Sequence, residues 1–87
     1  MPYRVTILPA AVRQLSKLST VDQRRIASKI DMLADNPRPP DSRKLAGADR
    51  LYRLRVGDCR VVYEILEKQL VVLVIRVGHR REVYRGL

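Results

Sequence analysis

The sequence has no phenylalanine or tryptophan, and only one cysteine and one histidine. The core must therefore be built mostly from leucine, valine and isoleucine, with some tyrosine. A lone cysteine excludes an internal disulfide and is typical of a protein in a reducing cytoplasm. The longest apolar run, residues 70–75, is far too short to cross a bilayer, and the N-terminus lacks the apolar run of a signal peptide. We expect one small cytoplasmic domain over residues 1–87, with no membrane contact.

Acidic residues are scarce beside basic ones, with 9 Asp and Glu against 18 Lys and Arg and a net charge of +9. Fourteen of the basic residues are arginine, whose planar fork suits phosphate and whose charge survives at any physiological pH. The excess occurs in both halves of the chain, so it belongs to the folded surface. Nucleic acid is the leading partner class and an acidic protein the second, while a basic surface that serves only solubility is the alternative.

Charged and apolar residues alternate on both sides of a Gly-Asp turn in residues 52–63. This pattern predicts a β-hairpin, and a two-residue loop places Arg55 opposite Arg60. Arg53, Arg55 and Arg60 then share one face of the sheet. Like charges opposite each other destabilise a strand pair, so we expect an anion between Arg55 and Arg60. The alternative is that these are solvated strand residues, with Glu64 available to pair with Arg60.

The other segments predict an α+β fold with the order β-α-α-β-β-β. We expect a strand at residues 2–8, a helix from Pro9, a second helix capped by Thr20 with Gln23, a proline-rich loop at 36–40, a turn at 67–69 and a buried central strand at 70–77. The helical hairpin should pack on one face of a mostly antiparallel sheet, which leaves the other face to the arginines.

The last segment, VGHRREVYR, is the second candidate element of a site. Gly78 is expected to end the central strand and to allow a tight exit from it. The chain that follows would then cross the sheet and bring Arg80 and Tyr84 to the arginine face. Taken singly, each residue also has a structural interpretation, as a solvated arginine or a tyrosine packed at an edge.

The run YRLRVGDCRVVYEI, the preceding KLAG and the terminal VGHRREVYR resemble the RelE/ParE superfamily of bacterial toxins, and most closely its RelE-type mRNA interferases from type II toxin–antitoxin systems. The similarity covers almost the whole chain. It implies cleavage of mRNA in the ribosomal A site without a metal or other cofactor, through attack of the ribose 2′-hydroxyl on the adjacent phosphate and release of a 2′,3′-cyclic phosphate. The implied partners are a cognate antitoxin, the ribosome with its mRNA, and operator DNA contacted through the antitoxin.

The resemblance also implies roles for individual residues. Arg60 corresponds to a phosphate clamp, Arg80 to the acid or charge stabiliser at the leaving group, and Tyr84 to a group that stacks on or orients a base. Together with Arg55 and His79 these form the candidate catalytic set, and the candidate RNA-binding residues are Lys44, Arg53, Arg81 and Arg85.

The chain departs from the family pattern at positions 53 and 55, where lysines are usual and the second is the expected base. Arginine effectively cannot give up its proton. His79 belongs to the residue type whose ordinary pKa suits a base, and Glu64 is the next candidate. A third possibility is catalysis by orientation and charge alone. The rival functions are a ParE-type inhibitor of DNA gyrase and a non-enzymatic nucleic-acid-binding or co-repressor module.

Overall fold

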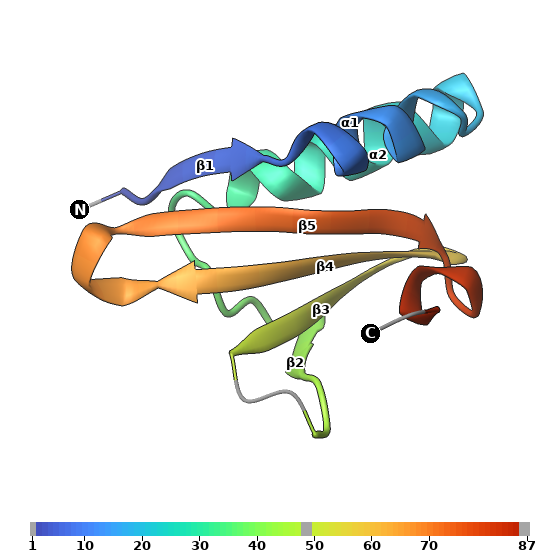
Figure 1. Cartoon of the computed structure of the whole chain (residues 1–87). Coiled ribbons are helices and arrows are strands. Elements are labelled where there is room, and N and C mark those ends of the chain that lie inside the picture. The colour runs from blue at the N-terminus through green and yellow to red at the C-terminus, as the bar shows by residue number, and fades with distance from the viewer. Residues whose placement is uncertain (1, 48–49, 86–87) are drawn as a thin grey trace.

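The computed structural model, which describes residues 2–47 and 50–85, consists of two helices packed on one five-stranded sheet (Figure 1). In chain order the elements are β1 (Arg4–Ile7), α1 (Pro9–Ser16), α2 (Thr20–Met32), β2 (Ser42–Lys44), β3 (Leu51–Val56), β4 (Cys59–Leu66), the 3-10 turn η1 (Glu67–Gln69), β5 (Val71–His79) and the 3-10 turn η2 (Glu82–Tyr84). The strand order is β1-β5-β4-β3-β2, and only the β1–β5 pair is parallel. The predicted α+β class and the mostly antiparallel sheet are confirmed.

The chain forms two separate helices, as predicted, with a break between Ser16 and Thr20. Pro9 starts α1, where its missing N–H costs nothing. The cap of α2 lies one residue earlier than expected, because the Ser19 side chain accepts the backbone N–H of Asp22 at 3.1 Å. Gln23 does not close a capping box with Thr20; its amide donates to the carbonyl of Leu18 at 2.9 Å and so ties α2 to the end of α1. Within the described residues, no helix has the length and apolar composition needed to cross a membrane.

The core fills the space between the helices and the facing side of the sheet. Its fully buried members are mostly aliphatic and include Ile26, Ile30, Leu33, Leu54, Val61, Val72 and Val74. Tyr63 is the largest of the buried side chains, and its hydroxyl donates to the carbonyl of Pro37 at 2.6 Å. Its ring also stacks on Tyr52, with 5.7 Å between the centroids. These contacts fix the proline-rich loop against the sheet.

The register of the β3–β4 hairpin is the one that the sequence predicts. Arg55 pairs with Arg60 and Arg53 with Val62, while Gly57 takes a φ of +58° in the turn. The short strand β2 was not predicted. It pairs with β3 so that Arg43 lies opposite Arg53, and it therefore adds a further arginine to the face that the helices leave open.

A bulge in β5 decides which of its residues face the open side. Val62 of β4 pairs with Arg76 and the next residue, Tyr63, pairs with Val74, so Ile75 is an extra residue. The alternation of side chains resets there: Val72, Val74 and Val77 all belong to the core. Arg76, which regular alternation from Val74 would place in the core, consequently lies on the open face.

The chain after β5 folds back over the open face, where η2 contacts both β4 and β5 (Figure 1). Val83 is 3% exposed and sits against Gly78, at which an added Cβ would lie 3.7 Å from the Cα and Cβ of Val83. The prediction that Gly78 ends the strand was wrong, since β5 continues through His79. The glycine also lacks a positive φ, so its lack of a side chain serves to leave room for Val83.

Two hydrogen-bonding groups hold this returning segment, which we call the tail turn (residues 80–85). The backbone N–H of Arg80 donates to the carbonyl of Asp58 at 3.0 Å and links the end of β5 to the hairpin turn. The Nη1 of Arg76 donates to the carbonyls of Val83 and Arg85. The tail turn is thus attached at both of its ends, and these attachments hold it in place across the open face.

Candidate functional site

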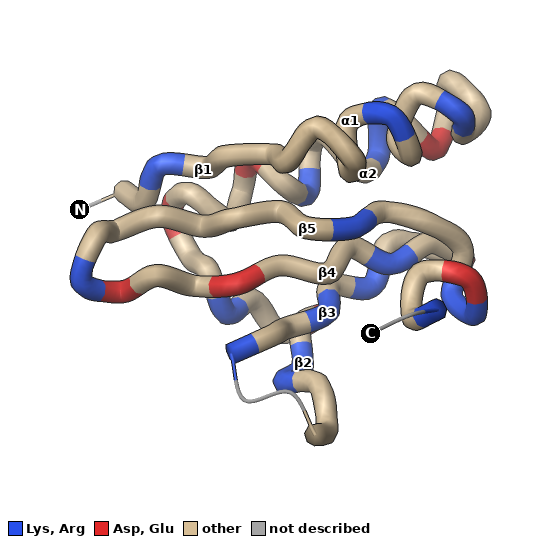
Figure 2. The backbone as a smooth tube through the Cα atoms, in the orientation of Figure 1, with Lys and Arg blue, Asp and Glu red and all other residues tan. Residues whose placement is uncertain are grey.

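The open face carries a depression of about 630 Å³ between β2, β3, β4 and the tail turn. Figure 2 shows Lys and Arg residues gathered where these elements meet, whereas the acidic residues of β4 and η1 lie toward the other end of β4 and a further one lies on the tail turn. We call this the basic depression, and its lining consists of Arg43, Lys44, Leu45, Ala46, Arg53, Arg60, Arg80, Arg81 and Tyr84. Six of the predicted site residues come together here: Lys44, Arg53, Arg60, Arg80, Arg81 and Tyr84.

Cross-strand pairing positions the floor of the basic depression. Arg43, Arg53 and Val62 form one row across three strands, and Val62 is fully buried. Arg60 is oriented by its own turn, because its Nη1 donates to the carbonyls of Gly57 at 2.9 Å and Cys59 at 2.8 Å. A guanidinium carries five N–H donors, so Arg60 keeps donors for a ligand while its side chain is held in place.

The tail turn supplies the opposite wall, with Arg80, Arg81 and Tyr84. Docking of Val83 against Gly78 and the bond from the Arg80 amide to Asp58 set the path of this segment. The prediction that the C-terminal segment brings Arg80 and Tyr84 to the arginine face is confirmed. The site therefore depends on a segment of about six residues that has little contact with the main core.

The charge of the basic depression is one-sided. Among the described residues that line it, five are arginines, one is lysine and none is acidic. Such a cluster can hold a phosphodiester by charge-assisted hydrogen bonds and can stabilise the additional negative charge of a pentacoordinate phosphorus. Sequence analysis did not identify Arg43 as a site residue. Its pairing with Arg53 would have identified it, but that pairing becomes visible only when β2 is recognised as a strand.

Arg55 lies outside the basic depression although its backbone pairs with Arg60 as predicted. Its exposed side chain lines a separate groove formed with α2, which we call the hairpin–helix groove. The expected anion site between Arg55 and Arg60 is therefore not seen, since Arg60 lines the basic depression and Arg55 lines the other groove. Glu64, the alternative partner of Arg60, pairs in register with Leu51 and Leu73 and does not line the basic depression either.

His79 also lies elsewhere, for a reason that follows from the bulge. After the bulge, Val77 and His79 occupy alternate positions on the side of the helices, so His79 faces a third depression lined in part by Gln14 of α1. Its Nδ1 is 3.9 Å from the Sγ of Cys59. Burial raises the pKa of this thiol above its ordinary value, and the pairing is not that of a reactive thiolate.

Arg85 completes the predicted set, and it too is absent from the lining of the basic depression. Its side chain is exposed and its carbonyl oxygen accepts from Arg76. Across residues 2–47 and 50–85, no three His, Cys, Asp or Glu side chains gather as they would at a metal site.

Comparison with known proteins identifies the family. Residues 5–84 match the model of the ParE toxin of the type II toxin–antitoxin system parDE. The chain belongs to the RelE/ParE superfamily of toxins. This RelE/ParE toxin is 31% identical to the mRNA interferase toxin RelE of Escherichia coli K12 over 88 residues, which cover 97% of this chain and 92% of that protein.

Solved structures agree with this assignment. A chain of the archaeal RelE–RelB complex of Pyrococcus horikoshii superposes with a TM-score of 0.82 at 35% identity, covering 93% of this chain and 98% of that one. The isolated Escherichia coli RelE toxin superposes with a TM-score of 0.77 at 28% identity, covering 94% and 90%. The RelE/ParE fold expected from the sequence is confirmed.

Proposed function

We propose that this RelE/ParE toxin is a ribonuclease of the RelE type, which cuts mRNA in the ribosomal A site and so stops translation. The observation that carries the proposal is the basic depression, where cations from three strands and the tail turn converge without an acidic side chain among the described lining residues. The name of the Escherichia coli relative, an mRNA interferase, supports the same class of activity.

The reaction would be attack of the ribose 2′-hydroxyl on the adjacent phosphate, with departure of the 5′-oxygen and a 2′,3′-cyclic phosphate as product. Arg60, held by its turn carbonyls, would clamp the phosphate and stabilise the phosphorane. Arg80 would stabilise the charge on the leaving oxygen from the opposite wall, and Tyr84 would stack on a base. No step in this scheme requires a metal ion or another cofactor.

The general base must be a group that can lose a proton near the 2′-hydroxyl. Arg55 and His79 both lie outside the basic depression, so their predicted roles in the chemistry lose support. Among the described lining residues, Lys44 and Tyr84 are the side chains that can give up a proton, since arginine retains its own. Lys44→Met and Tyr84→Phe, each measured across a pH–rate profile, distinguish these two candidates, because removal of the base abolishes the rise in rate that its deprotonation causes as the pH increases.

The partners follow from the same surface. We propose that a cognate antitoxin neutralises the toxin, that an acidic segment of it covers basic residues, and that the complex contacts operator DNA through the antitoxin. The archaeal structure is that of a RelE–RelB complex, which supports a partner of this kind. The proposal also places the protein in the cytoplasm, where ribosomes and mRNA are found.

The test uses purified toxin with ribosomes that carry a defined mRNA, and maps cuts by primer extension. We expect cleavage by the native chain and a loss of about a hundredfold to a thousandfold in Arg60→Gln, as for removal of one transition-state donor. Arg4→Gln, which removes an exposed arginine of β1, is the matched control and should cleave normally. Binding of RNA without any cleavage would instead support the non-enzymatic module.

A second candidate is inhibition of DNA gyrase, because the matching family model is that of ParE. Such an inhibitor needs the fold but no catalytic set. A supercoiling assay decides between the two functions: inhibition of gyrase together with intact mRNA in the ribosome assay would replace the ribonuclease proposal.

A further inference from the structure

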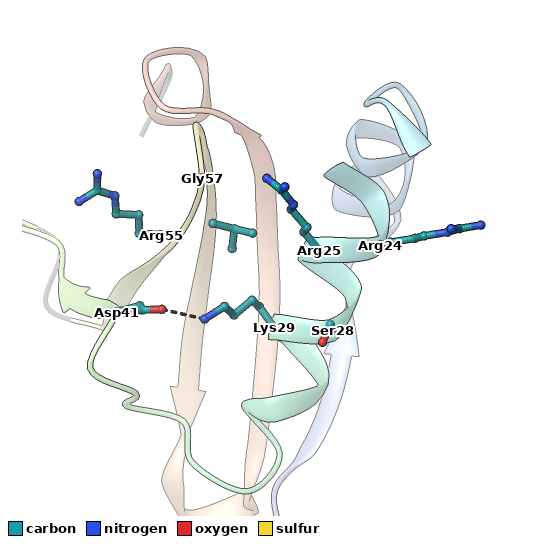
Figure 3. A pocket seen from close by; sticks show the side chains of 8 residues that line it. Arg24, Arg25, Ser28, Lys29, Asp41, Arg55 and Gly57 are labelled. Atoms are coloured by element: carbon teal, nitrogen blue, oxygen red, sulfur yellow. Dashed lines mark hydrogen bonds and ion pairs between the residues drawn. The ribbon is translucent and has the colours of Figure 1, made fainter. Parts of the chain in front are cut away.

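A second basic cavity, the hairpin–helix groove, lies between α2 and the tip of the β3–β4 hairpin. It measures about 730 Å³ and its charged lining is Arg24, Arg25, Lys29, Asp41 and Arg55. Even without Arg24, which points to the far side of α2 (Figure 3), three cations and one carboxylate leave it with a positive charge. It differs from the basic depression in its position, because α2 rather than the tail turn forms one of its sides.

Figure 3 shows how these side chains are directed. Arg25 and Lys29, one helical turn apart, extend from α2 toward the hairpin, whereas Arg24 points to the other side of the helix. Lys29 donates to Asp41 at 2.8 Å, and this bond lowers the pKa of the Asp41 carboxyl. The guanidinium of Arg25 lies over the turn, with Nη1 3.8 Å from the position that a Cβ on Gly57 would take.

Arg55 extends from the hairpin on the side away from α2 (Figure 3). Its side chain is exposed, and on the side of β2 the strand pairing stops at Ser42 and Leu54, beyond which the amide of Arg55 donates to the carbonyl of Asp41 at 3.2 Å. The two ion pairs among the described residues are Lys29–Asp41 and Arg38–Glu67, and they involve neither Arg25 nor Arg55. The groove therefore presents two guanidinium groups that form no ion pair with a described carboxylate, although the charge of Arg55 helps to lower the pKa of Asp41.

The lining favours phosphates over a peptide. Arginine forks match phosphate oxygens, and none of the described residues that line the groove is an aromatic on which a base would stack. A peptide would need apolar anchors, but Val56, the one large apolar side chain among the described lining residues, is only 7% exposed. The groove is thus suited to a nucleic-acid backbone of any sequence.

The groove also adjoins the basic depression through β3. Arg55 is two residues from Arg53, which lines the basic depression, and this separation is about 6.6 Å along a strand. The cross-strand partner of Arg55 is Arg60, another lining residue of the basic depression. Cations thus form a continuous path from one cavity to the other.

We infer that a single RNA strand bound in the basic depression continues past β3 into the hairpin–helix groove, where Arg25 and Arg55 hold its phosphodiester backbone. This inference rests on the RNA binding of the proposed function and adds a subsite to it. The groove contributes affinity that is independent of sequence and sensitive to salt. It also gives Arg55 a role in holding RNA that does not require it to lose a proton.

The experiment measures binding of fluorescent single-stranded RNA to the full chain by anisotropy, with oligonucleotides of about four and about twelve nucleotides, the shorter sized for one cavity. In Arg25→Gln/Arg55→Gln, the affinity for the longer RNA should fall about tenfold or more, since each exposed contact is worth about two- to tenfold. The slope of log K against log salt should become shallower by about 1.4, or about 0.7 for each lost phosphate contact. Affinity for the shorter RNA should stay within about twofold of native.

The matched control is Arg4→Gln/Arg13→Gln, which removes the same charge from two exposed sites on β1 and α1 and should bind both RNAs nearly as the native chain does. If Arg25→Gln/Arg55→Gln lost the same affinity for both RNA lengths, or if the control lost as much affinity as this variant, the inference that one RNA strand spans both cavities would be overturned. Unchanged RNA binding with weakened binding of a polyglutamate peptide would assign the groove to an acidic protein.

Arg53→Gln/Arg60→Gln separates this inference from the proposed function. If these substitutions in the basic depression weaken binding of both RNAs while Arg25→Gln/Arg55→Gln weakens binding of neither, the second subsite is refuted and the ribonuclease proposal is retained. A native chain that binds neither RNA would overturn both.

Discussion

Substitutions of Gly78 test whether the tail turn must dock for the site to form. An alanine Cβ at this position would lie 3.7 Å from the Cα and Cβ of Val83, which is an ordinary van der Waals contact. Alanine also loses less conformational entropy than glycine in a strand, by about 0.5–1 kcal/mol. We therefore expect Gly78→Ala to be as stable as the native chain or slightly more stable, with its tail turn in place.

Valine at the same position should behave differently. Its two methyl groups project beyond the Cβ into the space of Val83, and overpacking of this kind costs about 1–3 kcal/mol. Undocking the tail turn relieves the strain but exposes Val83, which is 3% exposed in the native fold, at a cost of about 1.5–3 kcal/mol. Because the two costs are similar, a large fraction of Gly78→Val molecules should have the tail turn undocked.

Hydrogen exchange and the ribosome cleavage assay report on this directly. The amide of Arg80 bonds to Asp58 and that of Arg85 bonds to Glu82 at 3.2 Å, so both should lose protection in the valine variant and keep it in the alanine variant. Cleavage should fall in Gly78→Val alone, while the main core, which lies on the other face, stays folded at the temperature of the assay. Native protection of both amides in Gly78→Val would show that contact with Val83 does not position the tail turn.

Three further predictions concern single side chains. Arg76→Gln removes the donor to two carbonyls of the tail turn, so exchange at the Arg85 amide should accelerate by about tenfold, and an unchanged rate would exclude a clamp. Tyr63→Phe leaves the carbonyl of Pro37 without its donor and should lower the free energy of urea unfolding by about 1–3 kcal/mol at neutral pH. Burial raises the pKa of Tyr63 above its ordinary value of 10.0. The stabilisation that the protonated hydroxyl provides is therefore complete below pH 10.0 and is lost as the pH rises through the pKa of the folded protein. Over that range, the difference in unfolding free energy between the native chain and Tyr63→Phe should become smaller. Cys59 is 1% exposed and burial raises its pKa, so a disulfide reagent should modify it only as fast as the chain opens, and rapid labelling of the folded protein would contradict this.

The parts of the fold that the sequence predicted are those set by local chemistry. A two-residue turn determines every pair in the β3–β4 hairpin, and Pro9 marks the start of α1. Strand β2 was missed because its three residues are polar and show no alternation, so that only pairing with β3 makes them a strand. The bulge at Ile75 was hidden for the opposite reason, since an unbroken apolar run has no polar residue to mark which side faces out.

In the site too, the residues placed by local sequence were predicted and those placed by distant elements were not. Arg53 and Arg60 were predicted together from the hairpin, and Arg80 and Tyr84 from the path of the tail. The separation of Arg55 depends on where β2 ends and on the neighbouring helix α2, and neither is encoded near residue 55.

The extra residue in β5 has a consequence for how this chain can change in length. If Ile75 were deleted, Tyr63 would still pair with Val74 and Val62 with Arg76, so every other pair between β4 and β5 would be kept. A one-residue deletion inside a central strand ordinarily exchanges the two sides of everything beyond it. Here it would leave the core valines on the side of the helices and Arg76, which holds the tail turn, on the open face, and would remove only the local twist that a bulge adds. Ile75 thus shapes the curvature of the sheet, and a chain without it would present the same site at a slightly different angle.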